Sequence, residues 1–313
     1  MRRYRWLFFN RKRRSLLNKT FFPENGKRWA GLLAGILTAA LLCVLYLGYF
    51  QDMAWMFPLK EDTCETENFR RMSFPGEGLS AAFSYAEENG LSPWDCIAVW
   101  MLKNDFSVSE NAVREMSGEE MEKQIGRAMG WKPEEFLQLR EAYRRALAGL
   151  VYFPVAESVR EEVKWVSFED SWGDGRSFGG ERKHEGCDIM GMEYPRGFYP
   201  VVSAAAGTVE KIGWLPQGGW RVGIRREDGG YDYYAHLYSY QEGIQAGDQV
   251  QAGEILGYMG DSGYSQTEGA VGNFPVHLHF GIYIETPHQE EQSVNPYDIL
   301  RYLEKQKRMA DYQ

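Results

Sequence analysis

The sequence predicts an α+β multidomain protein with one N-terminal transmembrane helix, a small helical region and a C-terminal, mainly antiparallel β domain. Three observations predict this organisation. Residues 29–50 form an uninterrupted apolar run, residues 77–150 carry helical periodicity and helix caps, and residues 155–303 consist of short alternating runs bounded by glycine. The 313 residues are enough for a membrane anchor and one or two domains.

The N-terminal region shows an abrupt change from basic to apolar sequence. Residues 1–28 contain ten Lys/Arg and one acidic residue, a net charge of +9, and the 22 residues from Trp29 to Phe50 contain no charge. At about 1.5 Å per residue such a helix spans a bilayer core of roughly 30 Å. We therefore expect a single-pass cell-membrane protein with residues 1–28 in the cytoplasm, a transmembrane helix at 29–50 and the C-terminal domain outside.

A cleaved signal peptide is the alternative interpretation of this segment. The apolar core of a signal peptide is usually about 7–15 residues long and ends in a small-x-small cleavage site. The apolar run in this chain is longer, and GYFQDMAW offers no good site. An uncleaved anchor in a lipid bilayer is therefore favoured.

The segment that follows carries the acidic charge of the chain. The whole chain has a net charge of −9, so the 285 residues after the basic segment carry −18, and nucleic acid is not an expected partner. Residues 51–76 hold acids, two prolines and few periodic apolar positions, so we expect a stalk. Cys64 and Cys96 form a disulfide in an oxidising compartment or remain two free thiols, and the spacing leaves both open.

Residues 77–150 predict three or four packed helices. GLSAAFSYAEENG is expected to end at Gly90, and SPWDCIAVWMLKNDF to begin after a Ser92 cap with Pro93 at its first position. SGEEMEKQIGRAMG and KPEEFLQLREAYRRALAGL are the remaining helices. No catalytic group of residues stands out in this part of the sequence, so we expect a spacer or a module that binds a protein partner.

Short strands dominate the rest of the chain. WRVGIRREDGGYDYYAHLYSY predicts two strands around an Asp-Gly-Gly turn, and GTVEKIG and GDQVQAGEILGYMG are further strands bounded by glycine. The next long helical pattern is NPYDILRYLEKQKRM, and residues 304–313 are expected to be a tail. The β domain itself is expected over residues 155–303.

Four of the five histidines lie on readable elements of this β-rich region. His184 is followed by Asp188 in HEGCD, where the surrounding glycines favour a loop that runs into a strand. His236 lies in YDYYAHLYS, on the second strand of the hairpin. Strict alternation predicts that His236 shares a face of the sheet with Asp232 and Tyr234.

The stretch VHLHFGIYI, residues 276–284, places two more histidines one residue apart. Read in steps of two, its aliphatic residues and phenylalanine fall on one face, whereas His277 and His279 fall on the other, which is the period of a half-buried strand. HxxxD, a strand histidine and HxH within about 100 residues of one domain predict a metal site.

The residue types in this pattern suit a catalytic metal. Catalytic Zn²⁺ takes three protein ligands and keeps one position open for water, whose pKa it lowers to about 7. Further imidazoles that do not bind the metal move protons near neutral pH. Two histidines and one acid as ligands, with two histidines left over, match the count in this sequence. Such a donor set also accepts neighbouring divalent metals.

At these residues the chain resembles the M23 family of zinc metallopeptidases, the LytM/lysostaphin-type endopeptidases that cut peptide bridges in bacterial peptidoglycan. The family pattern is HxxxD, a strand ending in His-Leu, and HLHF, which are present here as HEGCD, YAHL and HLHF. The resemblance covers about residues 168–300 and implies an M23/LytM-type domain with one Zn²⁺ per chain. The zinc ligands that it implies are His184, Asp188 and His279, and the catalytic histidines are His236 and His277.

The resemblance implies a membrane-anchored endopeptidase that hydrolyses peptidoglycan cross-links by attack of a metal-activated water. One alternative is a non-enzymatic or partner-activated LytM-type interaction module in cell-envelope or sporulation complexes, against which the complete ligand set argues. A metal-dependent hydrolase of another class that uses similar ligands is a third hypothesis.

Two features depart from the family pattern. The sequence QTEGAVGNFPV lengthens the loop before the HxH strand, and we expect this loop to lie beside the groove. Cys187 stands next to Asp188 and is expected to be a buried, inert thiol. His288 is expected at the surface. Packing and rim roles are expected for three tyrosines, Tyr233, Tyr234 and Tyr283.

Overall fold

The computed structural model describes residues 24–109 and 111–312, and the chain divides into two compact units, residues 1–54 and 55–313. The described part of the first unit is helix α1, Glu24–Met53, whose apolar side chains from Trp29 to Phe50 are exposed. Its length and composition allow it to cross a membrane. The helix expected at 29–50 is therefore part of a longer one, and most of the expected basic segment, residues 1–23, lies outside the described residues.

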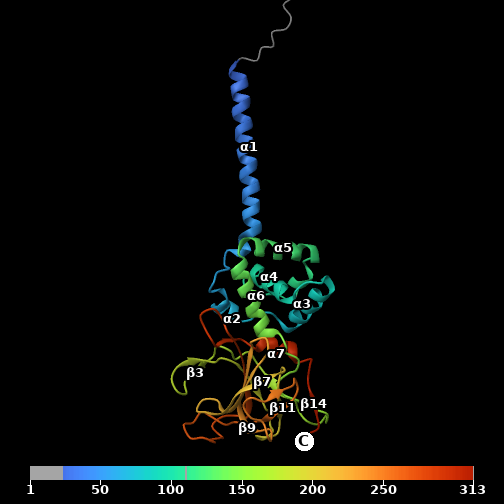
Figure 1. Ribbon diagram of the computed structural model, residues 1–313, viewed down its shortest axis with the longest axis vertical. Helices are drawn as coiled ribbons and strands as arrows, with labels where there is room; N and C mark the ends of the chain where they lie inside the picture. The colour runs from blue at the N-terminus through green and yellow to red at the C-terminus, as the bar shows by residue number, and fades with distance from the viewer. Residues whose placement is uncertain (1–23, 110, 313) are drawn as a thin grey trace, which may run out of the picture. The chain divides into compact units, whose positions relative to one another are not determined.

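The second unit begins with a helical layer (Figure 1). Its α-helices are α2 Glu67–Arg70, α3 Gly76–Asn89, α4 Pro93–Lys103, α5 Gly118–Trp131 and α6 Pro133–Leu147. Short 3₁₀ helices are η1 Ala54–Met56, η2 Thr63–Glu65 and η3 Ala112–Arg114. The predicted ends are confirmed: Ser92 caps α4 by accepting a hydrogen bond from the Asp95 amide, and Gly90 ends α3 with φ +64°.

Most strands of the unit form one large sheet, in which all pairs are antiparallel. The order along its main path is β10-β7-β8-β9-β12-β5-β2, with β6, β11 and β13 attached at its sides. The strands of this sheet are β2 Ser167–Phe168, β5 Cys187–Met190, β6 Pro200–Val202, β7 Gly207–Leu215, β8 Gly219–Arg225, β9 Tyr231–Tyr240, β10 Gln249–Val250, β11 Ile255–Met259, β12 His277–Ile284 and β13 Gln292–Val294. The predicted mainly antiparallel β domain is confirmed.

Smaller elements complete the unit. They are a hairpin of β3 Gly175–Arg176 and β4 Arg182–Lys183, a parallel pair of β1 Glu157–Ser158 and β14 Met309–Ala310, and helix α7 Tyr297–Leu303. Helix α7 packs against α3, and α6 packs against β12, so the helical layer and the sheet share one core. The strand that carries His277 and His279 is thus supported from the helical side.

The predicted β8–β9 hairpin is confirmed and sets the register of the sheet. Gly229 in its turn has φ +91°, a conformation that favours glycine, and the Asp228 carboxylate accepts a hydrogen bond from the Gly230 amide at 2.9 Å. Strand β12 lies between β9 and β5, with His279 opposite both Ala235 and Asp188. This register brings distant parts of the sequence to one place on the sheet.

The expected stalk at 51–76 is wrong from residue 55 onward. Phe69 is buried against the Tyr143 ring, and Leu59 and Phe74 are also buried. The Arg70 guanidinium donates to the backbone oxygen and to the hydroxyl of Ser293 at 3.0 and 2.8 Å. The short helical turns of this segment carry too few apolar residues to show a period, although Leu59, Phe69 and Phe74 are buried.

The expected tail at 304–313 is also part of the fold where it is described. Residues 309–310 pair with β1, and the Tyr312 hydroxyl donates to the backbone oxygen of Ala156 at 2.7 Å. The expected final helix is correspondingly shorter, because α7 ends at Leu303. Pairing with β1 draws the chain end onto the domain, and no local pattern in the sequence signals such a contact.

The predicted face of His236 is wrong. The pairing of β9 with β8 and β11 shifts register near this residue, and His236 has φ +62°. This irregularity rotates His236 away from the face of Tyr234, which is fully buried against Phe280, and toward His279. Strict alternation fails here because one β-bulge changes the side to which the following side chain points.

Candidate active site

His184 and His279 meet because the loop before β5 approaches β12 closely. A Cβ atom on Gly186 would lie 2.5 Å from the Phe280 oxygen and 2.6 Å from the His279 ring, so only glycine fits there. The Nδ1 atom of His184 donates to the backbone oxygen of Ser171 at 2.7 Å. That bond fixes the tautomer and leaves the Nε2 lone pair facing the other ligand atoms.

Three donor atoms converge at this point. His184 Nε2 lies 2.8 Å from His279 Nδ1 and 3.0 Å from Asp188 Oδ1, and His279 Nδ1 lies 3.2 Å from the same oxygen. Ligands about 2.0–2.1 Å from a tetrahedral zinc are separated by about 3.3 Å. Two imidazole nitrogens and one carboxylate oxygen at these separations fit a divalent cation of the zinc type, and the three residues form a metal-binding group.

Asp188 is held for this role by Arg176. The Arg176 guanidinium donates to Oδ2 at 2.9 Å, while Oδ1 faces the histidines. Burial alone would raise the pKa of Asp188, but hydrogen bonds with His184 and His279 lower it far below its usual range. The carboxylate is therefore ionised and oriented, as a metal ligand must be.

Two further histidines lie beside the donor atoms. The His236 and His277 rings are 4.7 Å apart, and His236 lies 6.0 Å from the His279 ring, measured between ring centroids. Nδ1 of His236 donates to the Ser262 oxygen at 2.7 Å, and Nδ1 of His277 donates to the Pro275 oxygen at 2.8 Å. The Nε2 atom of each ring is therefore the one left to exchange protons.

Burial determines the protonation of these rings. It lowers the pKa of His236 well below its ordinary value and lowers that of His277 as well. Burial also lowers the pKa of His279 to about 4. All three imidazoles are consequently neutral at pH 7, which suits a metal ligand and a proton acceptor alike.

The long loop before β12 lies beside the site, as the sequence predicts. Phe274 packs against both His236 and His277, with ring centroids 4.7 and 5.1 Å apart. Tyr264 lies against His236 at 5.4 Å and lines the adjoining groove. The loop therefore forms one wall of the site and fixes the two rings from the side opposite the sheet.

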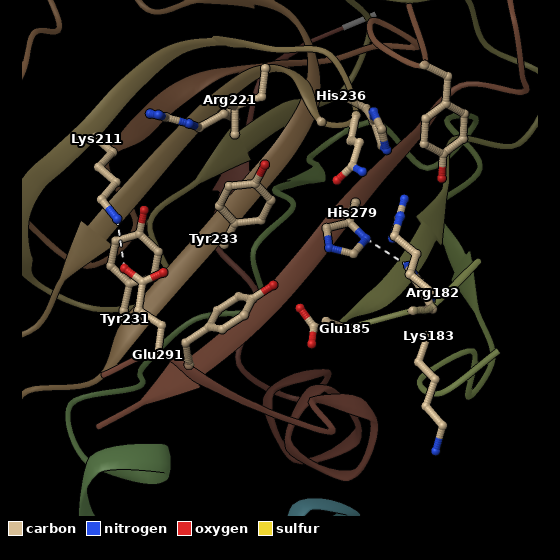
Figure 2. Close-up of a pocket in the computed structure, with 16 residues that line it drawn as sticks. Arg182, Lys183, Glu185, Lys211, Arg221, Tyr231, Tyr233, His236, His279 and Glu291 are labelled. Atoms are coloured by element: carbon tan, nitrogen blue, oxygen red, sulfur yellow. Dashed lines mark hydrogen bonds and ion pairs between the residues drawn. The ribbon is translucent and has the colours of Figure 1, made fainter. Parts of the chain in front are cut away.

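A groove of about 600 Å³ opens from the site along the sheet (Figure 2). His184, His236 and His279 lie at one end, and Lys211, Arg221 and Glu291 line another part. Of the three tyrosines, Tyr233 and Tyr283 line the groove, whereas Tyr234 is buried and accepts a hydrogen bond from the Ala204 amide. The groove offers an extended polymer a path past the donor atoms.

The cysteines outside helix α1 and the fifth histidine take no part in this site. Cys187 is buried, donates to the Glu169 oxygen at 3.1 Å and has a pKa raised by burial to about 12, as expected for an inert thiol. Cys64 and Cys96 are free thiols. His288 is exposed, as expected, and its Nδ1 atom lies 3.0 Å from a Glu65 carboxylate oxygen.

Comparisons with known proteins agree with this geometry. Peptidase family M23 matches residues 182–296. A Ruminococcus gnavus protein, assigned as a glycyl-glycine endopeptidase LytM, is 34% identical in sequence to this chain. Its crystal structure matches with a TM-score of 0.68 over 83% of this chain and 99% of the Ruminococcus gnavus chain. This chain belongs to peptidase family M23. It is a metallo-endopeptidase homologue whose metal-binding residues are intact.

Two curated M23 relatives have more specific names. An L-Ala–D-Glu endopeptidase of Bacillus subtilis is 41% identical over 171 residues, which are 55% of this chain and 49% of the relative. Lysostaphin of Staphylococcus simulans is 34% identical over 97 residues, which are 29% of this chain and 18% of the relative. The chain thus spans half or less of each of these curated relatives.

Sequence reasoning did not identify several residues that support the M23 site. Ser171 and Ser262 act through backbone oxygens, which carry no sequence signal, and Arg176 lies 12 residues before the carboxylate that it holds. Phe274 belongs to the loop that the sequence marked as unusually long. The loop length was a usable signal for Phe274, whereas the other contacts depend on the three-dimensional pairing of β5 with β12.

Proposed function

We propose that this chain is a zinc-dependent endopeptidase that hydrolyses peptide bonds of bacterial peptidoglycan. One observation carries the proposal: three donor atoms lie within 2.8–3.2 Å of one another, beside two non-ligand histidines and a groove. The names of two relatives, an L-Ala–D-Glu endopeptidase and a glycyl-glycine endopeptidase, support a peptide substrate. Zinc is the proposed metal, with His184, Asp188 and His279 as its ligands.

The chemistry divides between the metal and the chain. A zinc ion bound by these three residues supplies a Lewis acid that polarises the scissile carbonyl and lowers the pKa of water. His236 and His277 supply the proton transfers through their Nε2 atoms. A neutral ring takes a proton from the attacking water as the C–O bond forms, and the ring that is protonated in this way gives that proton to the departing amine as the C–N bond breaks.

We also propose that α1 anchors the chain in the cell membrane, with the N-terminus in the cytoplasm and the M23 domain outside. The exposed apolar surface of α1 and the basic residues that precede it support this topology. A protein partner for the helical layer remains a prediction. Because α6 packs against β12, such a partner would contact a surface that is continuous with the support of the catalytic strand.

The test uses the full chain in detergent solution, with purified peptidoglycan as the substrate. The release of new free amines is measured with and without a chelator, beside a His279→Ala variant. Release that the chelator and the variant both abolish supports a metal peptidase. No release despite one bound zinc per chain would instead favour the interaction module, or a domain that awaits an activating partner.

A further inference from the structure

Two nitrogen atoms of the Arg221 guanidinium in the groove have no hydrogen-bond partner among the described residues. Arg221 lies on β8, and its Nε and Nη1 atoms are buried without a hydrogen-bond partner. Buried polar groups are nearly always hydrogen-bonded, because leaving a charged donor unpaired costs more than an ordinary hydrogen bond contributes. Such a guanidinium in a groove needs a partner from outside the chain.

The two lysines of the groove, unlike Arg221, have carboxylate partners within the chain. Lys211 lies 2.7 Å from a Glu291 carboxylate oxygen, and Lys183 lies 3.5 Å from a Glu67 carboxylate oxygen. Arg182 resembles Arg221, because its Nε atom is also buried without a partner in the described chain. The unsatisfied donors of the groove are therefore guanidinium groups.

The charge of the groove is opposite to that of the chain around it. Its lining contains four Lys/Arg and two glutamates, whereas residues 29–313 carry a net charge of −18. One of those two glutamates, Glu291, is paired with Lys211. A local excess of positive charge in an acidic domain favours an anionic ligand and raises its concentration at the groove.

Arg221 lies close to the proposed reaction centre. In Figure 2, Tyr233 lies between Arg221 and His279, and the Tyr233 and His279 rings are 5.8 Å apart. Burial raises the pKa of Tyr233 to about 12, and the nearby Arg221 charge opposes that rise. A peptide that passes the metal-binding residues therefore presents its neighbouring groups to Arg221.

We propose that Arg221 is a specificity-determining residue that binds a carboxylate borne by the substrate near the scissile bond. The preferred substrate is then an acidic peptide, such as one with an L-Ala–D-Glu bond, and not an uncharged glycyl-glycine bridge. A planar guanidinium binds a carboxylate through two parallel hydrogen bonds, which glycine residues cannot provide. This inference rests on the proposed peptidase function and names its substrate class.

The experiment compares three substrates with the zinc-loaded full chain. The first is a peptide with an L-Ala–D-Glu bond and a free carboxylate on the D-Glu residue. The second is the same peptide with that carboxylate converted to a carboxamide, and the third is pentaglycine. We expect kcat/KM for the acid to exceed that for the amide by about 10- to 100-fold, the value of one charge-assisted interaction.

Variants assign this preference to Arg221. Arg221→Gln should lose the preference, because its kcat/KM for the acid falls by a larger factor than its kcat/KM for the amide. Arg221→Lys should restore only part of it, because an ammonium is a point charge. Arg160→Gln is the control, because Arg160 pairs with the exposed Asp311 and does not line the groove. Equal hydrolysis of acid and amide, or an equal loss on both in Arg221→Gln, would overturn the inference.

A binding measurement separates this inference from the proposed function. The acid and the amide are titrated into the zinc-loaded His236→Ala full chain and followed by calorimetry. The carboxylate site would be supported if the acid binds more tightly than the amide and if this difference disappears when Arg221→Gln is added to His236→Ala. That result would hold even if no substrate is hydrolysed. Equal binding of the two peptides would overturn it, whereas absence of all hydrolysis would count against the proposed function alone.

Discussion

His184 Nε2 lies 2.8 Å from His279 Nδ1, although 95 residues separate the two histidines in the sequence. The antiparallel pairing of β5 with β12 brings them together, because it places Asp188 directly opposite His279. Gly186 allows the loop that carries His184 to reach the ring. One strand pairing and one glycine thus assemble the whole donor set.

Loss of the Arg176 side chain should weaken metal binding. Arg176 holds the second oxygen of Asp188, and outer partners of this kind typically contribute about 10- to 100-fold in metal affinity. We expect Arg176→Gln to raise the zinc Kd by that factor, measured by competition with a chromogenic chelator. Arg160→Gln, which alters an exposed pair with Asp311, is the control. An unchanged zinc Kd would show that the Asp188 carboxylate keeps its orientation without Arg176.

Substitution of either non-ligand histidine should separate metal binding from catalysis. Proton transfer by a positioned group typically contributes about 10²- to 10⁴-fold to the rate. We expect His236→Ala and His277→Ala to lower kcat by that range and to retain one zinc per chain, as measured by metal analysis. If either variant lost its zinc, that histidine would be a ligand and the division of roles would be incorrect.

Two glycines of the helical layer should respond oppositely to the same substitution. Gly90 ends α3 with φ +64°, so Gly90→Ala should lower the free energy of unfolding by about 1 kcal/mol. Gly130 lies within α5 with open space around it, so Gly130→Ala should raise that free energy by about 0.5–1 kcal/mol. Denaturation of the full chain provides the measurement, and shifts of equal sign would contradict the account.

Asp298 should make the stability of the protein depend on pH. Burial raises the pKa of this carboxyl to about 6, although its Oδ2 atom accepts a hydrogen bond from the Phe74 amide at 3.0 Å. In the unfolded chain the pKa is near its ordinary value of about 3.9. Between about pH 4 and pH 6 the folded state therefore binds more protons, and this carboxyl lowers the free energy of unfolding as the pH rises.

Asp298→Asn removes that titration and keeps an oxygen that accepts the Phe74 hydrogen bond. Relative to the natural chain, the variant should gain about 1 kcal/mol of unfolding free energy when the pH is raised from 4.5 to 7.5, since the carboxyl is partly solvated. Denaturant midpoints at the two pH values measure this difference. A relative loss of stability at pH 7.5 would show that the carboxyl is stabilising when ionised.

The parts of the fold that could be predicted are those with a local period or a local cap. Alternation in VHLHFGIYI gives β12, the Asp-Gly-Gly turn gives the β8–β9 hairpin, and Ser92 with Pro93 gives the start of α4. The metal-binding residues could be predicted because the short motifs HEGCD, YAHL and HLHF resemble the M23 pattern. Each strand, turn, cap or motif is signalled by a few neighbouring residues, and the resemblance joins the three distant motifs into one site.

The parts that could not be predicted depend on distant contacts. His236 changes face because β9 shifts register against two neighbouring strands, and the sequence near His236 does not signal the bulge. Phe69 and the chain around it pack against Tyr143 instead of forming a stalk. The unpaired guanidinium groups of the groove, Arg182 and Arg221, lie on strands of two different sheets and line one groove only in the folded chain.

The central claim is that His184, Asp188 and His279 form one metal site that drives peptide hydrolysis, and a metal titration tests it most directly. Zinc is added in steps to the chelator-treated full chain, and hydrolysis of peptidoglycan is measured at each step. The account predicts that activity rises linearly, reaches its plateau at one zinc per chain and stays absent in His279→Ala. Full activity in the chelator-treated chain, or equal activation of the variant, would contradict it.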